Sequence, residues 1–110
     1  YAVFSQPEIA SVGMTEDKAI QSMGKDNIKV YRSIFRPLSK SLPKTGSKCI
    51  LKLIVDKNNN KVLGCHMIGD NASEIIQMAS ISLMLGAKKS DFDNTMALHP
   101  TIAEEFVTMR

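Results

Sequence analysis

Residues 49–69 read CILKLIVDKNNNKVLGCHMIG, and this stretch decides the fold. Two apolar runs, residues 49–56 and 61–69, flank a lysine and three asparagines, and asparagine tolerates the left-handed dihedrals of tight turns. The pattern therefore predicts an antiparallel β-hairpin. Both runs are apolar at almost every position, so we expect the sheet that they form to be covered on both faces.

The segments before the hairpin predict further strands and one short helix. Residues 2–14 indicate two strands separated by Gln6-Pro7, because proline cannot donate to a strand ladder, and residues 29–35 indicate another. Between them, we expect a helix that begins after the N-cap Thr15 and stops at Gly24. Residues 36–47 are rich in proline and serine and predict a long exposed loop.

A longer helix is expected from Asn71, where Glu74 three positions later forms a variant of the capping box, to Gly86. Its residues are apolar almost all round, which leaves two interpretations. It is either the central helix of a core, or it packs one side on the sheet and another on a partner subunit. We favour the partner, because 110 residues offer few places to bury a helix completely.

Short helices after Ser90 and Thr101 complete the predicted elements. Strands come first and helices afterwards, with a hairpin between them. This order predicts an α+β fold with a mainly antiparallel sheet flanked by helices, in one domain that covers residues 1–110. The chain opens at Tyr1 as if already in a strand, so we expect it to be a fragment of a longer protein.

Composition argues against several kinds of function. The net charge of +3 comes from scattered lysines and arginines, whereas nucleic-acid binders concentrate them on one face. No run approaches the ~20 apolar residues that span a membrane, and no signal peptide is visible. Cys49 and Cys65 each lie in an apolar run, far from any cluster that could bind a metal, and are interpreted as buried strand thiols.

The C-terminal stretch ALHPTIAEEFVTMR, residues 97–110, carries unusual chemistry. Thr101 and Glu104 form a T-x-x-E capping box, and Pro100 forces His99 into an extended conformation just before the helix. A histidine held by a carboxylate is also the usual way to build an acid–base group for neutral pH. Spacing alone favours the capping interpretation and leaves the catalytic one open.

Four stretches together resemble a known family: VFSQPEIASVGMTE (3–16), VLGCHMIGD (62–70), GAKKSDFDNT (86–95) and HPTIAEEFVTMR (99–110). In order along the whole chain, they resemble the C-terminal dimerisation domain of glutathione-reductase-type flavoenzymes, in the pyridine nucleotide-disulfide oxidoreductase family. The resemblance implies a homodimeric parent with FAD and NADPH bound mainly in upstream domains. Neither GxGxxG nor CxxxxC occurs in this chain, so we expect the isolated domain to be inactive.

The same resemblance implies roles for individual residues. His99 would be the acid–base group that protonates the leaving glutathione thiolate in the partner's active site, and Glu104 would orient it. His99 and Pro100 would lie close to the partner's flavin, with a cis bond between them. Residues that match the glutathione-disulfide site are Glu105, Thr108 and Leu38, the last in the loop where such enzymes differ.

Some alternatives remain open from the sequence. A sister reductase acting on trypanothione, glutathione amide or lipoamide would share most of these features, although the Glu104-Glu105 pair favours the glutathione type over lipoamide. A non-catalytic interaction module is a further alternative. His66, in mid-strand, is interpreted as a structural histidine, and reductive activity with unpaired cysteines indicates a cytoplasmic or other reducing compartment.

Overall fold

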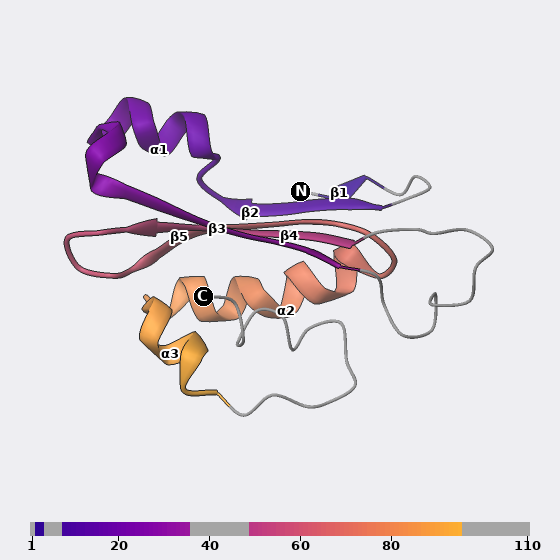
Figure 1. Ribbon diagram of the computed structural model, residues 1–110. Coiled ribbons are helices and arrows are strands. Elements are labelled where there is room, and N and C mark those ends of the chain that lie inside the picture. Colours follow the sequence, from indigo (N-terminus) through magenta and orange to yellow (C-terminus); the bar gives the residue numbers. More distant parts are fainter. Residues whose placement is uncertain (1, 4–7, 36–48, 96–110) are drawn as a thin grey trace.

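The computed structural model describes residues 2–3, 8–35 and 49–95, and these form one five-stranded antiparallel sheet with helices on both faces (Figure 1). The strand order is β1-β2-β5-β4-β3. The strands are β1 (Ala2–Val3), β2 (Ile9–Gly13), β3 (Ile28–Phe35), β4 (Cys49–Asp56) and β5 (Val62–Ile68). Helix α1 (Glu16–Met23) lies on one face, and α2 (Ala72–Met84) and α3 (Lys89–Asp93) lie on the other. The predicted α+β class with an antiparallel sheet is confirmed.

The β4–β5 hairpin forms as predicted, with Leu51 opposite Met67 and Leu53 opposite Cys65. Local side chains support its turn, since the Asp56 carboxylate accepts from the Asn58 N–H at 2.9 Å. Asn60 takes a left-handed conformation with φ of 65°, which asparagine adopts more easily than most residues. A shift in register at Ile54 and Val55 lets Val62 pair with Val55.

The core has two parts, one on each face of the sheet, because alternate residues of β4 point in opposite directions. Leu51 and Leu53 are fully buried on the face of α2 and α3, together with Ile76 of α2. Ile54 is fully buried on the other face against Ala19 of α1. The expectation that the hairpin is covered on both faces is confirmed where these helices lie.

Helix α1 begins and ends with the predicted residues. The Thr15 hydroxyl accepts from the Lys18 N–H at 3.2 Å, and Gly24 ends the helix with φ of 88°. The short 3₁₀ helix η1 (Lys25–Asn27) follows and was not predicted from the sequence. The Asn27 side chain donates to the Met23 carbonyl at 2.6 Å, which ties this extra turn to the end of α1.

Asn71 is the N-cap of α2, as predicted, but the predicted capping box is wrong, and the extent of the helix is nearly right. Asn71 has left-handed dihedrals, φ 65° and ψ 20°, and its side chain makes no capping hydrogen bond. The Glu8 carboxylate caps the start of the helix instead, accepting from the Ser73 N–H at 3.2 Å and from the Ser73 hydroxyl at 2.8 Å. Gly86, with φ of 73°, follows the end of the helix as predicted. Helix α3 begins at Lys89, slightly earlier than predicted.

Candidate functional site

All the site residues predicted from the sequence lie outside the described residues. They are Leu38, His99, Pro100, Glu104, Glu105 and Thr108. The predicted loop over residues 36–47 and the helix after Thr101 lie outside them too. These assignments therefore stay predictions.

The last described element, α3, is anchored to the sheet by a buried lysine. The Lys89 side chain, 3% exposed, forms an ion pair with Asp93. Its ammonium nitrogen also lies 4.6 Å from the centroid of the Tyr31 ring on β3, within the range of a cation–π interaction. Phe92 is buried beside it in the main core. The chain is therefore held against the sheet close to residue 95, four positions before His99.

Helix α2 presents an apolar surface away from the sheet. Ala72 and Ile76 are buried on its inner side. Four large apolar side chains at its outer side and C-terminal end are 52–87% exposed: Met78, Ile81, Met84 and Leu85. Met78, Ile81 and Leu85 follow the i, i+3, i+7 spacing of a single helical stripe. Exposed apolar stripes of this kind are typical of association surfaces, and the favoured interpretation of α2 as a partner contact stays a prediction.

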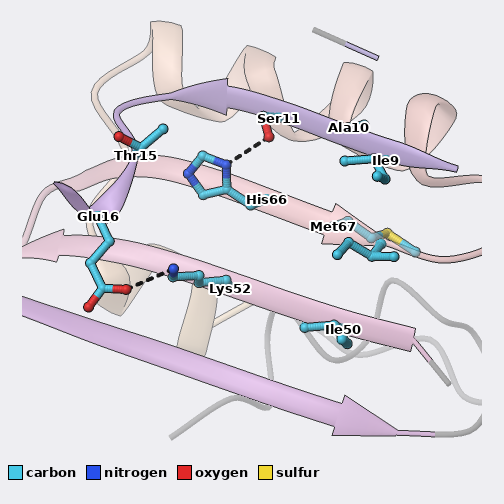
Figure 2. A pocket seen from close by; sticks show the side chains of 10 residues that line it. Ile9, Ala10, Ser11, Thr15, Glu16, Ile50, Lys52, His66 and Met67 are labelled. Atoms are coloured by element: carbon cyan, nitrogen blue, oxygen red, sulfur yellow. Dashed lines mark hydrogen bonds and ion pairs between the residues drawn. The ribbon is translucent and has the colours of Figure 1, made fainter. Parts of the chain in front are cut away.

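His66 points from β5 toward the start of α1 and uses both ring nitrogens (Figure 2). Its Nε2 lies 2.8 Å from the Met14 carbonyl oxygen, which can only accept, so Nε2 carries the hydrogen. Its Nδ1 lies 2.9 Å from the Ser11 hydroxyl. Burial, with a smaller effect from nearby Lys52, lowers the pKa of the imidazole, while the bond to Met14 opposes this. The structural interpretation of His66 is confirmed.

A small ionic cluster lies beside His66 on the same face. The Glu16 carboxylate accepts from Lys52 Nζ and from Arg32 Nη2, each at 2.8 Å. The hydrogen bond from Lys52 is the main reason that the pKa of Glu16 is lowered. Because Glu16 belongs to the first turn of α1, the cluster fixes the start of this helix over β3 and β4.

These groups form one end of an open pocket of about 250 Å³. Its other end is aliphatic, with Ile9 and Ile50 drawn in Figure 2. The walls are formed by Ile9, Ala10, Ser11, Thr15, Glu16, Ile50, Lys52, His66, Met67 and Ile68. Sequence reasoning missed this grouping, because its residues come together only through the register of three strands and the cap of α1.

Both cysteines are buried in the main core without a disulfide, as predicted. Burial raises the pKa of Cys65 to about 12, and burial raises that of Cys49 as well. A thiolate is the reactive form of cysteine, so neither residue is suited to disulfide exchange. Within the described ranges, no three potential metal ligands lie together, and no helix has the length and hydropathy needed to cross a bilayer.

The described residues thus define an α+β domain whose helix α2 exposes an apolar stripe. Residues 1–110 match the family described as "Pyridine nucleotide-disulphide oxidoreductase, dimerisation domain", and the chain belongs to this family. The resemblance seen in the sequence is therefore confirmed.

Three relatives are named glutathione reductase. The one from Nostoc sp. is 49% identical over 109 residues, which cover 99% of this chain and 24% of that protein. The one from Burkholderia cepacia is 44% identical over 110 residues, 100% of this chain and 24% of the relative. The one from Pisum sativum, named as chloroplastic/mitochondrial, is 47% identical over 109 residues, 99% of this chain and 19% of the relative. The chain thus spans less than a quarter of the length of these relatives.

Proposed function

We propose that residues 1–110 form one dimerisation domain at the C-terminal end of an NADPH-dependent, FAD-containing glutathione-disulfide reductase. The observation that carries this proposal is the 44–49% identity to three proteins named glutathione reductase, over at least 99% of this chain. The buried, unpaired cysteines support an upstream location for the redox-active disulfide. They also support a reducing compartment, such as the cytoplasm, for the parent enzyme.

In this proposal, the domain contributes to the active site of the partner subunit. Attack of a cysteine thiolate on glutathione disulfide forms a mixed disulfide and releases one glutathione thiolate. His99, as imidazolium, donates its proton to that leaving thiolate, and Glu104 orients the ring. Glu105, Thr108 and Leu38 line the glutathione-disulfide site. His99 and Pro100 lie close to the flavin, which supplies electrons from NADPH to the disulfide when bound in the upstream domains.

The proposed homodimer would associate through α2. Its exposed stripe of Met78, Ile81 and Leu85 offers an apolar surface that a second copy could cover. A two-fold contact places the same stripe of both copies in one interface, so each exposed side chain of the stripe is buried in both subunits. Neither nucleic acid nor a membrane is a partner in this proposal.

The direct test is NADPH oxidation by the full-length dimeric parent in the presence of glutathione disulfide. Rapid turnover is expected. If the parent binds a reducible flavin but leaves glutathione disulfide unreduced, the substrate assignment is wrong. Trypanothione, glutathione amide disulfide and lipoamide, tested in the same assay, would then identify a sister reductase. A parent without a reducible flavin would leave the non-catalytic module as the function.

A further inference from the structure

A row of four isoleucines crosses the sheet on the face that carries α1. The register aligns Ile9 with Ile68, Ile68 with Ile50, and Ile50 with Ile34. With neighbouring strands ~4.8 Å apart, this aliphatic row is roughly 14 Å wide. Ile34 is 63% exposed and the other three are half-buried.

Helix α1 does not cover the aliphatic row. The buried cluster beneath α1 contains Ile28 and Ile54, and none of the four isoleucines belongs to either core cluster of the described residues. Between α1 and the aliphatic row runs a polar row in register, Ser11, His66, Lys52 and Arg32. In the described part of the chain, the aliphatic row is thus apolar surface without a helix over it.

The positive charge of the polar row makes this surface favour a partner that carries negative charge. Lys52 and Arg32 share the single carboxylate of Glu16, so two positive charges against one negative leave a net +1. His66, with its lowered pKa, adds no charge at neutral pH. A well-matched partner surface would place aliphatic side chains on the isoleucines and a carboxylate or carbonyl oxygen toward Arg32.

We infer that the aliphatic row is the surface on which the upstream part of the same polypeptide docks. This inference rests on the proposed function, in which the domain belongs to a longer flavoenzyme. The relatives are at least four times as long as their matched segment, which covers 19–24% of each, so a parent of that length has a large upstream part available to cover the row. Helix α2 on the opposite face is the place for a second copy. Strand β1 brings the chain to the row, since Val3 pairs with Ile9.

Photo-crosslinking of the full-length parent tests this inference. A benzophenone side chain is placed at Ile34, the most exposed isoleucine, in dimers assembled from a mixture of light and isotopically heavy chains. We expect cross-links to peptides upstream of Tyr1 within a chain of the same isotope. The same probe at Met78 on α2 is the control, and it should yield cross-links between light and heavy chains.

Three outcomes at Ile34 would overturn the inference: cross-links between light and heavy chains, cross-links confined to residues 1–110, or none above background. Because the probe is bulky, hydrogen exchange in the Ile34→Asp parent gives a second measurement. Exchange in β3 and β4 should be about 10-fold faster than in the unmodified parent, at unchanged dimer mass. Unchanged exchange would contradict docking. Neither measurement requires turnover, so a parent that does not reduce glutathione disulfide would still give a clear result on docking.

Discussion

The ammonium group of Lys89 lies 4.6 Å from the centroid of the Tyr31 ring, which joins α3 to the strand at the edge of the sheet. Lys29 Nζ lies 5.1 Å from the centroid of the same ring. The Asp93 ion pair and the contact of Lys89 with this ring compensate for the burial of the Lys89 charge, which would otherwise be costly. They make α3 an anchor for the segment that leads toward His99.

Lys89→Met should therefore destabilise the chain by about 1–3 kcal/mol, because it keeps the apolar stem but leaves Asp93 without this ion pair and removes the ring contact. Urea denaturation measures the loss. Lys88→Met, at the exposed neighbouring position, is the control and should change stability by less than about 0.5 kcal/mol. Equal effects of the two substitutions would show that the contacts of Lys89 contribute nothing particular.

His66→Leu should cost about 1–3 kcal/mol at neutral pH, because it leaves the half-buried Met14 carbonyl without its donor. The cost should shrink on acidification. The pKa of His66 in the folded state lies below 6.5, so the folded state binds fewer protons than the unfolded state. The contribution of His66 to the free energy of unfolding is therefore lost as pH falls below 6.5. Urea denaturation of both proteins at pH 7.5 and 5.5 measures the difference. A difference in the free energy of unfolding between the two proteins that is larger at pH 5.5 than at pH 7.5 would contradict a neutral His66 ring.

Glu16→Gln should destabilise the chain by less than about 1 kcal/mol at pH 7, since the ion pairs with Arg32 and Lys52 are near the surface. The lowered pKa of Glu16 means that its contribution is present above pH 4.5 and is lost as pH falls further. High salt should weaken it as well. Asp17→Asn, in the same first turn, controls for the helix dipole. Equal losses for both variants would assign the effect to the dipole alone.

These interactions also show how far the sequence could predict the fold. The hairpin and α1 were predictable because their signals are local: asparagines in one turn, Thr15 before a helix and Gly24 after it. The cap of α2 was not, because its acceptor, Glu8, is 65 positions away from Ser73. The aliphatic and polar rows depend on the register of four strands, which no single segment specifies.

The candidate site was predicted in a different way. Spacing alone favoured the capping interpretation and left a catalytic role for His99 open, because T-x-x-E is a common helix start. The resemblance favours the catalytic interpretation by matching the whole motif, and the family match supports that resemblance, while the role of His99 stays a prediction. The predicted roles of Glu104, Glu105 and Thr108 involve a partner subunit and a substrate, which the pattern of a single chain does not contain.

Ile81→Asp should weaken the parent dimer, because it places a charge in the centre of the exposed stripe of α2. At an interface hot spot, we expect the dissociation constant of the dimer to rise at least ~100-fold. Sedimentation of the full-length parent at low concentration measures it. Gln21→Asp, on α1 at the opposite face, is the control and should leave the dimer mass unchanged. An unchanged mass for Ile81→Asp would mean that the stripe lies outside the dimer contact.

His99→Gln in the full-length parent should lower the rate of glutathione-disulfide reduction at least ~10²-fold, because glutamine cannot supply a proton to the leaving thiolate. Flavin reduction by NADPH precedes this proton transfer, so stopped-flow absorbance should show it unchanged. The chain contains one other histidine, and His66→Gln is the matched control. Its ring serves only Ser11 and Met14 among the contacts seen here, so turnover should stay near normal. Near-normal turnover of His99→Gln would refute the acid–base assignment, whereas loss of flavin reduction in that variant would indicate a structural role instead.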